Sequence, residues 1–482
     1  MSLGLDTRAE VVKLAQVLGV PAEELAYLER AAPDDLRALR EQATDALFDG
    51  DRDRLHKLAL ASRLLPSSIA ARIAHWALGP LLSARVTGLL DPGKAVDLAK
   101  RLPSTFLADI AIELDPRRAR EVIELMPATQ VAEVAHELAG RGQEVTMGRF
   151  VGYLGDEAIS AAMERISDAS LLRTAFVMEG KDRLDHLLGL IPEQRLASIL
   201  RAAEQERLWP EALDLLDHMP DQRKGSLAEI AASEGLLESL AESAYAEGLW
   251  DSVLPVIPLM SDSSKVTLAR LRLVEDRDAL ASILDAAAEY DLWAALLPLV
   301  EHLPVGPRDQ VAALGATLPQ PVLEHIVDLV NEGNLWSMFV PLAADHMDAV
   351  GRERVAQIIA HVNLSVITGI ADAVERDSLW PELLRIAGEM RPDQLSRIAD
   401  RLLAVGLEGR LPAMLAATEA TGLWETGLRM LGALDPGLKQ RLAPVASTMS
   451  SGERARVVAK ARDLGLLDEL GPIGSVLVGA GA

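Results

Sequence analysis

A histidine directly follows an acid in Asp185-His186, Asp217-His218, Glu301-His302 and Asp345-His346, and such a pair can bind a divalent metal or titrate near neutral pH. Three of them, His218, His302 and His346, also lie nine or ten residues after a tryptophan. A residue that recurs in register is first a feature of a repeat, and a histidine near a helix C-terminus is favoured by the helix dipole. Stacked repeats advance by about 10 Å, so these side chains are too far apart to share one ion. We therefore predict no metal site among them.

The chain lacks the motifs of several common enzyme classes. It has no cysteine, which excludes disulfides, zinc fingers, iron–sulfur clusters and a thiol nucleophile. It has no glycine-rich phosphate loop, no HExxH pair and no GxSxG turn. Asp34 and Asp35 follow Pro33, as acids at a helix start ordinarily do. We expect a protein that is not an enzyme.

Six of the seven tryptophans mark a repeat. Each follows a leucine, and their separations are 41, 43, 43, 44 and 44 residues. These values lie in the range of HEAT and armadillo-type helical repeats. Apolar residues at i, i+3, i+4 and i+7 precede the Leu-Trp pairs and form one helix face. The six residues are Trp209, Trp250, Trp293, Trp336, Trp380 and Trp424.

Each repeat should contain two or three short helices, which bury their apolar faces only by stacking on neighbouring repeats. The sequence therefore predicts an all-α fold, an α-solenoid of short antiparallel helices, with the tryptophan-marked repeats over residues 179–449. Pro255, Pro298 and Pro341 each stand five residues after a tryptophan. We expect them to kink or restart the helix in three successive repeats.

The tryptophans have two interpretations. Aromatic residues are 3% of a chain that is 49% hydrophobic, so the core should consist of Leu, Ala, Val and Ile. An indole at a fixed repeat position would then fill the junction between consecutive repeats. Alternatively, the six rings line a groove that binds a ligand or peptide. In that case the six tryptophans, with His218, His302 and His346, are the candidate binding residues.

Residues 61–178 follow a different pattern. Pro92, Pro103, Pro116 and Pro127 are 11 to 13 residues apart. Proline is well tolerated at the first position of a helix, so each should mark a new helix of about two turns. Asp, Leu or Met precedes each proline, and a short helix rich in Ala and Leu follows, as in LDPGKAVDLAKRLPSTFLADIAIELDPRRAREVIELMP.

On this motif, residues 85–170 resemble the cytosolic N-domain superhelix of MgtE-type magnesium transporters. They are also similar, more loosely, to the helical repeats of the flagellar motor-switch protein FliG. The resemblance implies a superhelix of short helices. In the transporter family this domain binds magnesium through carboxylates at domain interfaces and gates the channel, so magnesium is the one cofactor that the resemblance suggests. It assigns no individual ligand.

The two ends are predicted to be caps. Residues 1–60 should form an N-terminal helical cap, in which residues 13–31 resemble the first part of a repressor-type helix-turn-helix. The would-be recognition helix carries Glu23, Glu24 and Glu29, which disfavours DNA. Residues 450–482 should form a C-terminal cap with an apolar tail from residue 471. We expect a floppy tail, with self-association through it as the alternative.

The net charge of −24 disfavours binding to nucleic acid. Asp6 and Glu10 near the start argue against a signal peptide. The most apolar stretch, residues 64–90, contains Arg72 and Arg85, so no membrane span is expected. We expect a cytoplasmic protein, and the excess of Arg over Lys suggests a bacterial source.

The leading prediction is a non-enzymatic helical-repeat scaffold that binds a partner protein or peptide, basic in charge, on its concave surface. One alternative is a solenoid that binds a small molecule between the tryptophan-containing repeats, or magnesium at acidic interfaces. A second alternative is an enzyme with a site on the concave face.

Overall fold

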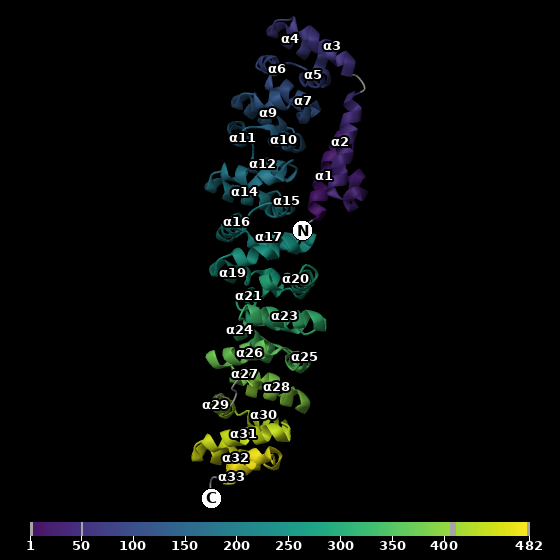
Figure 1. The fold of residues 1–482 in the computed structure, drawn as a ribbon. Helices are drawn as coiled ribbons and strands as arrows, with labels where there is room; N and C mark the ends of the chain where they lie inside the picture. The colour runs from purple at the N-terminus through teal and green to yellow at the C-terminus, as the bar shows by residue number, and fades with distance from the viewer. Residues whose placement is uncertain (1–2, 50–51, 405–410, 480–482) are drawn as a thin grey trace. The chain divides into compact units, whose positions relative to one another are not determined.

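The computed structural model of this chain describes residues 3–49, 52–404 and 411–479, and these contain helices and no strand. The chain divides into two compact units, Met1–Ser264 and Lys265–Ala482. Within each unit the helices stack on one another in chain order (Figure 1). The predicted all-α solenoid is confirmed. Among the described residues, no helix is both long and apolar enough to cross a bilayer.

The first unit begins with a helical hairpin and continues with short helices. The hairpin consists of α1 Leu3–Leu18, η1 Ala22–Arg30 and α2 Pro33–Asp49. The short helices are α3 Arg52–Arg63, α4 Ser67–Ile73, η2 Ala74–Leu78, α5 Gly79–Thr87, α6 Pro92–Ala99, α7 Ser104–Glu113, η3 Pro116–Arg118, α8 Arg120–Glu124, α9 Ala128–Gly140, α10 Glu144–Phe150, η4 Val151–Tyr153, α11 Asp156–Met163, α12 Asp168–Phe176, η5 Lys181–Arg183 and α13 Leu184–Gly189.

Tryptophan-marked repeats follow in both units. The helices up to the boundary are α14 Glu193–Gln205, α15 Trp209–Leu216, α16 Asp221–Ser233, α17 Leu237–Glu247, α18 Trp250–Val253, η6 Leu254–Leu259 and α19 Asp262–Leu268. Those after it are η7 Arg272–Glu275, α20 Arg277–Glu289, α21 Trp293–Val300, α22 Val305–Gly315, α23 Gln320–Glu332, α24 Trp336–Pro341, η8 Leu342–His346, α25 Ala349–Ile359, α26 Leu364–Arg376, α27 Trp380–Ala387, α28 Pro392–Ala404, α29 Leu411–Thr421, α30 Trp424–Ala433, α31 Pro436–Thr448, α32 Ser451–Asp463, η10 Asp468–Leu470 and α33 Pro472–Gly479.

Every repeat tryptophan is the first residue of a helix, and a left-handed residue stands two positions before it. Gly248 and Gly422 occupy this position in two repeats. In the other four it is a residue with a side chain, at φ between 51° and 59°: Arg207, Asp291, Asn334 and Ser378. This is the C′ position of a helix that ends in a left-handed turn.

In five of the six repeats the leucine of the Leu-Trp pair closes that turn. Its amide donates a hydrogen bond to a carbonyl five residues earlier, as from Leu208 to Ala203 (2.7 Å) and from Leu335 to Val330 (2.8 Å). This is the outer hydrogen bond of a Schellman motif, which satisfies the last carbonyls of the helix. The reversal sends the following tryptophan into the core, where Trp336 is 1% exposed.

The prediction that Pro255, Pro298 and Pro341 kink or restart a helix has a different outcome in each repeat. At Pro255 the α-helix α18 gives way to the 3₁₀ helix η6, and at Pro341 α24 gives way to the π-helix η8. Pro298 lies inside α21, which runs on to Val300. In the short-helix part, Pro92 and Pro116 are the first residues of α6 and η3, and Pro103 and Pro127 directly precede α7 and α9. There the predicted helix starts are confirmed.

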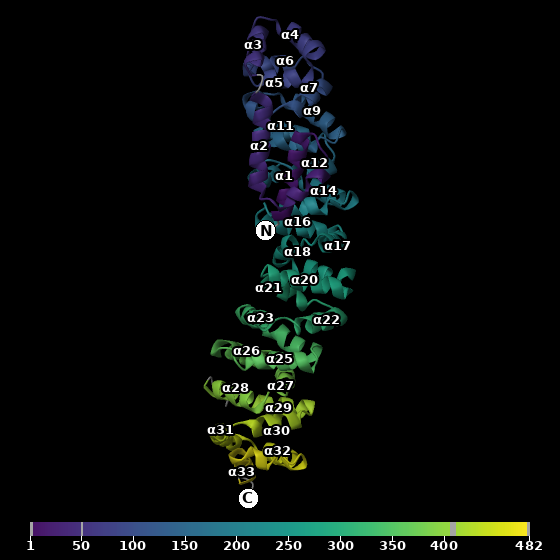
Figure 2. The ribbon, with the colours of Figure 1, turned by 90° about the vertical axis from the view of Figure 1, so that its right-hand side faces the viewer.

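The hairpin of α1 and α2 packs along the side of the first unit, with α1 against α10 and α15 (Figures 1 and 2). It has its own small core, which includes Val11, Leu14 and Leu36. The would-be recognition helix of the helix-turn-helix resemblance is the 3₁₀ helix η1. The segment predicted as an N-terminal cap therefore lies beside the short helices.

Charged side chains are buried where the hairpin meets the rest of the first unit. Glu10, Lys13 and Arg40 are each at most 5% exposed. The Lys13 ammonium is 2.5 Å from the Glu10 carboxylate, and the Arg40 guanidinium is 2.7 Å from the carboxylate of Glu179. Burial lowers the pKa of Lys13. Because such ions are costly to leave unpaired, the charges specify how the hairpin docks.

The expectation of a floppy C-terminal tail is wrong for most of its length. Residues Pro472–Gly479 form α33, which packs on α31 and α32 and buries Ile473 and Leu477. Apolar side chains at this spacing gain more from burial than the short helix loses in chain entropy. Residues 480–482 lie outside the described part of the chain.

The left-handed position before each tryptophan yields a stability prediction. Ser378 (φ 59°) pays a steric penalty that glycine avoids, so Ser378→Gly should raise the free energy of unfolding by about 1 kcal/mol. Gly248→Ala (φ 70°) should lower it by about 1 kcal/mol. Urea unfolding followed by circular dichroism measures both changes.

Gly140→Ala is the matched control, because Gly140 lies in helix α9 without a positive φ and with open space around the added methyl group. This substitution should leave the stability unchanged or slightly raised. If Gly248→Ala and Gly140→Ala had equal effects, the proposed role of the left-handed turn would be wrong.

Candidate functional site

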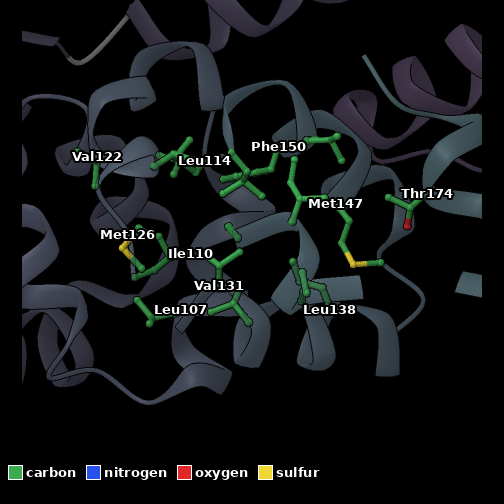
Figure 3. Close-up of a pocket in the computed structure, with 18 of the residues that line it drawn as sticks. Leu107, Ile110, Leu114, Val122, Met126, Val131, Leu138, Met147, Phe150 and Thr174 are labelled. Atoms are coloured by element: carbon green, nitrogen blue, oxygen red, sulfur yellow. The ribbon is translucent and has the colours of Figure 1, made fainter. Parts of the chain in front are cut away.

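An apolar cavity runs through the short helices of the first unit. Its volume is about 310 Å³, and the residues that line it extend from Ser62 in α3 to Leu215 in α15. Figure 3 shows its middle part, where Leu107 and Ile110 of α7 lie opposite Val131 and Leu138 of α9. Because the lining residues come from a succession of stacked helices, the cavity is extended along the stack.

Regular stripes on successive helices build the walls. In α7 and its C-cap the lining residues are Leu107, Ile110, Ala111 and Leu114, and in α9 they are Val131, Val134, Ala135 and Leu138. Both sets follow the spacing i, i+3, i+4 and i+7, which places them on one face of each helix. The prolines at the helix starts keep the helices short, so each contributes a single stripe.

The lining offers no free hydrogen-bond donor. It contains four hydroxyl side chains and no charged residue. The hydroxyls of Ser62, Thr87 and Thr174 each donate to a backbone carbonyl of their own helix at 2.7 Å. The Ser83 hydroxyl donates to the Ala74 carbonyl at 3.5 Å. An apolar cavity of this kind stays dry or holds an apolar guest.

The small size of the side chains explains the space. Phe150 is the one aromatic residue among those that line the cavity, and alanine contributes at Ala99, Ala111, Ala135 and Ala162. Protein interiors normally fill such space with large side chains. The sequence did not reveal this site, because its residues have the types and spacing of an ordinary helical core.

A second cluster joins the hairpin to the repeats. Asp6 of α1, Asp214 of α15 and His218 each offer a ligand atom, and these atoms lie within 4.8 Å of one another. The Lys181 ammonium lies 2.8 Å from Asp6 and 2.5 Å from Asp214. The lysine thus supplies the positive charge that a metal ion would otherwise bring. Magnesium binding, suggested by the transporter resemblance, stays a prediction.

The two carboxylates of this cluster differ in burial and in pKa. Asp214 is 1% exposed, and burial raises its pKa above the ordinary value although Lys181 opposes the shift. Asp6 is only partly buried, and His218 and Lys181 hold its pKa well below the usual range. Asp214 therefore depends on Lys181 to stay ionised. One feature of the sequence indicates this site, the acid Asp214 inside the apolar helix WPEALDLL.

The structure does not bring the three predicted histidines together. His218 lies 3.7 Å from Asp6, His302 lies 3.4 Å from its neighbour Glu301, and the Nδ1 atom of His346 is 2.5 Å from Asp309. Each thus has a carboxylate partner of its own. A partner-binding role for these residues stays a prediction.

Five of the six repeat tryptophans are buried, at 1–7% exposure, and Trp424 is half-buried. The burial agrees with the packing interpretation. Trp380 lines a cavity of about 120 Å³, and Trp424 lines one of about 170 Å³. Contact between the six tryptophans and a ligand or partner stays a prediction. Nearly all residues that line the cavity of 310 Å³ precede the first of these tryptophans in the sequence.

Neither models of known protein families nor curated protein sequences match this chain. Among solved structures, the chain is similar to a "circular tandem repeat protein with novel repeat topology and enhanced subunit contact surfaces" at 16% sequence identity. The match covers 99% of this chain and 94% of that chain, with a TM-score of 0.16. This likeness gives no residue of the site a role.

The buried pair of Lys181 and Asp214 gives a prediction with a defined pH dependence. Lys181→Met leaves Asp214 without a counter-charge and should lower the free energy of unfolding by about 3–5 kcal/mol at neutral pH. Protonation of Asp214 removes this cost. The difference from the wild type should therefore shrink as the pH falls through the raised pKa of Asp214.

Thermal unfolding of both proteins across a pH series provides the measurement. Lys460→Met, at an exposed position, is the control and should change stability by no more than about 0.5 kcal/mol at any pH. A Lys181→Met deficit that did not vary with pH would show that Asp214 is not the group left unpaired.

Proposed function

We propose that this chain is a non-enzymatic helical-repeat protein that binds an unbranched aliphatic chain in the cavity of its first unit. One observation carries the proposal, an extended cavity of about 310 Å³ whose hydroxyl groups already donate to backbone carbonyls. A polar ligand placed there would lose its hydrogen bonds to water and gain none. The part of the ligand inside must therefore be hydrocarbon.

The shape of the cavity narrows the ligand class. Stripes on successive helices from α3 to α15 form the lining, so the space is long and each helix contributes only a few side chains. A flexible acyl or alkyl chain fits such a space better than a compact ring system. Any charged or polar head group of the ligand must remain outside the apolar walls.

The volume sets the length of the occupant. At about 30 Å³ for a group the size of a water molecule, the cavity of about 310 Å³ holds about ten carbon atoms. Each buried methylene contributes about 0.8 kcal/mol. The gain is partly offset by the ordering of the chain and the loss of its free motion.

Binding should therefore depend steeply on chain length. In a calorimetric titration with saturated fatty acids, each added methylene should lower the Kd about fourfold up to about ten carbons, after which the gain should level off. A Kd that is independent of chain length, or no binding at any length, would overturn the proposal.

Cavity-filling variants locate the binding site. Ala111→Leu and Ala135→Leu place extra carbon atoms in the cavity from α7 and α9 and should weaken the binding of the longer acids about tenfold or more. Ala313→Leu, the same substitution at an exposed position, should leave the Kd unchanged. Circular dichroism of each variant shows whether the fold is kept.

The partner-binding scaffold predicted from the sequence is a second candidate. Val305 and Val350 favour it, because they are 66% and 64% exposed and lie near the starts of α22 and α25 in successive repeats. Exposed apolar side chains near the starts of corresponding helices in successive repeats can form a recognition surface. The acidic chain would suit a basic partner.

If this candidate function is correct, the wild-type protein should capture a basic protein at low salt. A Val305→Lys, Val350→Lys double variant should not capture it. Affinity capture from a native lysate, repeated with both proteins, makes the comparison. Equal capture by the two proteins would exclude these valines as the recognition surface.

A further inference from the structure

One stretch of this acidic chain carries no acid. Residues 54–90 contain no Asp or Glu, although the whole chain has a net charge of −24. They contain five basic residues: Arg54, Lys57, Arg63, Arg72 and Arg85. The side chains of Lys57 and Arg72 are exposed. This stretch therefore carries a net positive charge within an acidic chain.

The same stretch exposes large apolar side chains. Of the nineteen large hydrophobic residues found exposed in the described ranges, eight lie within residues 58–82. Leu64 is 87% exposed and Trp76 is 81% exposed. We call the eight residues the α3–α5 patch: Leu58, Leu60, Leu64, Ile69, Ile73, Trp76, Leu81 and Leu82. Exposed apolar residues gathered in this way mark an interaction site.

The patch lies on helices that pack together. Helix α3 contacts α5, and η2 contacts both α4 and α5. In both views of the first unit, α3 and α4 form one end of its stack of short helices (Figures 1 and 2). The end of a helical array normally has a polar outer face, so an apolar end indicates a surface that something else covers.

We infer that the α3–α5 patch binds the surface of an anionic lipid bilayer. Leucine, isoleucine and tryptophan side chains enter the boundary between head groups and acyl chains. Lys57 and Arg72 stand among them, where they can contact lipid phosphate and carboxylate groups. The acidic remainder of the chain is repelled by such a surface, so attachment at this patch also orients the first unit.

Other occupants fit less well. A nucleic acid would be held mainly by basic residues contacting phosphates and by aromatic rings stacked on bases. Here exposed aliphatic side chains outnumber exposed basic ones, and Trp76 is the single aromatic residue of the patch. A second copy of the chain could place its own apolar patch on this one, but it would also bring Lys57 and Arg72 of both copies together, whereas a bilayer supplies anionic groups to them. Both occupants give distinct outcomes in the experiment below.

The patch and the cavity share their helices. Ser62 of α3, Ala70 of α4, Ala74 and Leu78 of η2, and Ser83 of α5 line the cavity, whereas the patch residues of the same helices face outward. Membrane attachment would thus bring one end of the cavity to the source of aliphatic chains. This link rests on the proposed function, whereas the attachment itself does not.

Co-flotation with vesicles tests the attachment without any added ligand. The full chain should float with vesicles of phosphatidylcholine containing about 30% phosphatidylserine. It should float at least tenfold less with phosphatidylcholine alone, and less as salt rises. Leu64→Ser with Trp76→Ser should reduce binding at least tenfold, and Lys57→Glu with Arg72→Glu should do the same.

Two matched pairs are the controls. Val305→Ser with Val350→Ser removes equally exposed apolar groups, and Arg270→Glu with Lys460→Glu makes the same charge change at exposed positions of the second unit. Both pairs should bind as the wild type does. Circular dichroism and fatty-acid titration of the patch variants show that fold and cavity are kept.

Three results would overturn the inference. If the control variants reduced flotation as much as the patch variants did, the patch would be excluded as the membrane-binding surface. Sedimentation equilibrium that shows a dimer broken by Leu64→Ser with Trp76→Ser, without vesicle binding, would assign the patch to a second copy. Retention on an oligonucleotide but not on vesicles would assign it to nucleic acid. A failed fatty-acid titration with intact vesicle binding would remove only the link to the cavity.

Discussion

The tryptophan-marked repeats depend on one backbone reversal, the left-handed residue two positions before each tryptophan. It ends one helix, lets the next leucine close the turn, and starts the following helix with an indole that points into the core. Only glycine adopts this conformation without a penalty, yet four of the six repeats use Arg, Asp, Asn or Ser. The packing of the indole must outweigh the strain, since burying a tryptophan is worth several kcal/mol.

The period, the helix starts and the fold class could be predicted, because they depend on local patterns of apolar residues and prolines. The left-handed position could be predicted only where it holds Gly, Asn or Asp, since Arg207 and Ser378 give no sign of positive φ. The side-on docking of the hairpin was also missed. It relies on the ion pair of Arg40 and Glu179, and two charges so far apart in the sequence leave no periodic signal. The same holds for Lys181 and Asp214.

The sequence did not predict the cavity or the α3–α5 patch, because the residues of both resemble an ordinary helical core. The cavity residues look like any helical core, and the empty space appears only when the stripes of successive helices meet across the stack. The patch residues also read as a core stripe, because exposure cannot be read from residue type. Its one sequence signal was the absence of acid over residues 54–90. A core with few aromatic residues thus forms a regular stack of helices and leaves a cavity inside it.

The π-helix η8 shows how this array accommodates changes in repeat length. A π turn amounts to one inserted residue within a helix, and His346 lies ten residues after its tryptophan where His218 and His302 lie nine after theirs. His346 still reaches Asp309 on α22, and α27 still begins at Trp380. The extra residue therefore alters only the π-helical turn, and the next tryptophan still begins its helix. Arrays of this kind can therefore gain residues one at a time during evolution while successive repeats stay in register.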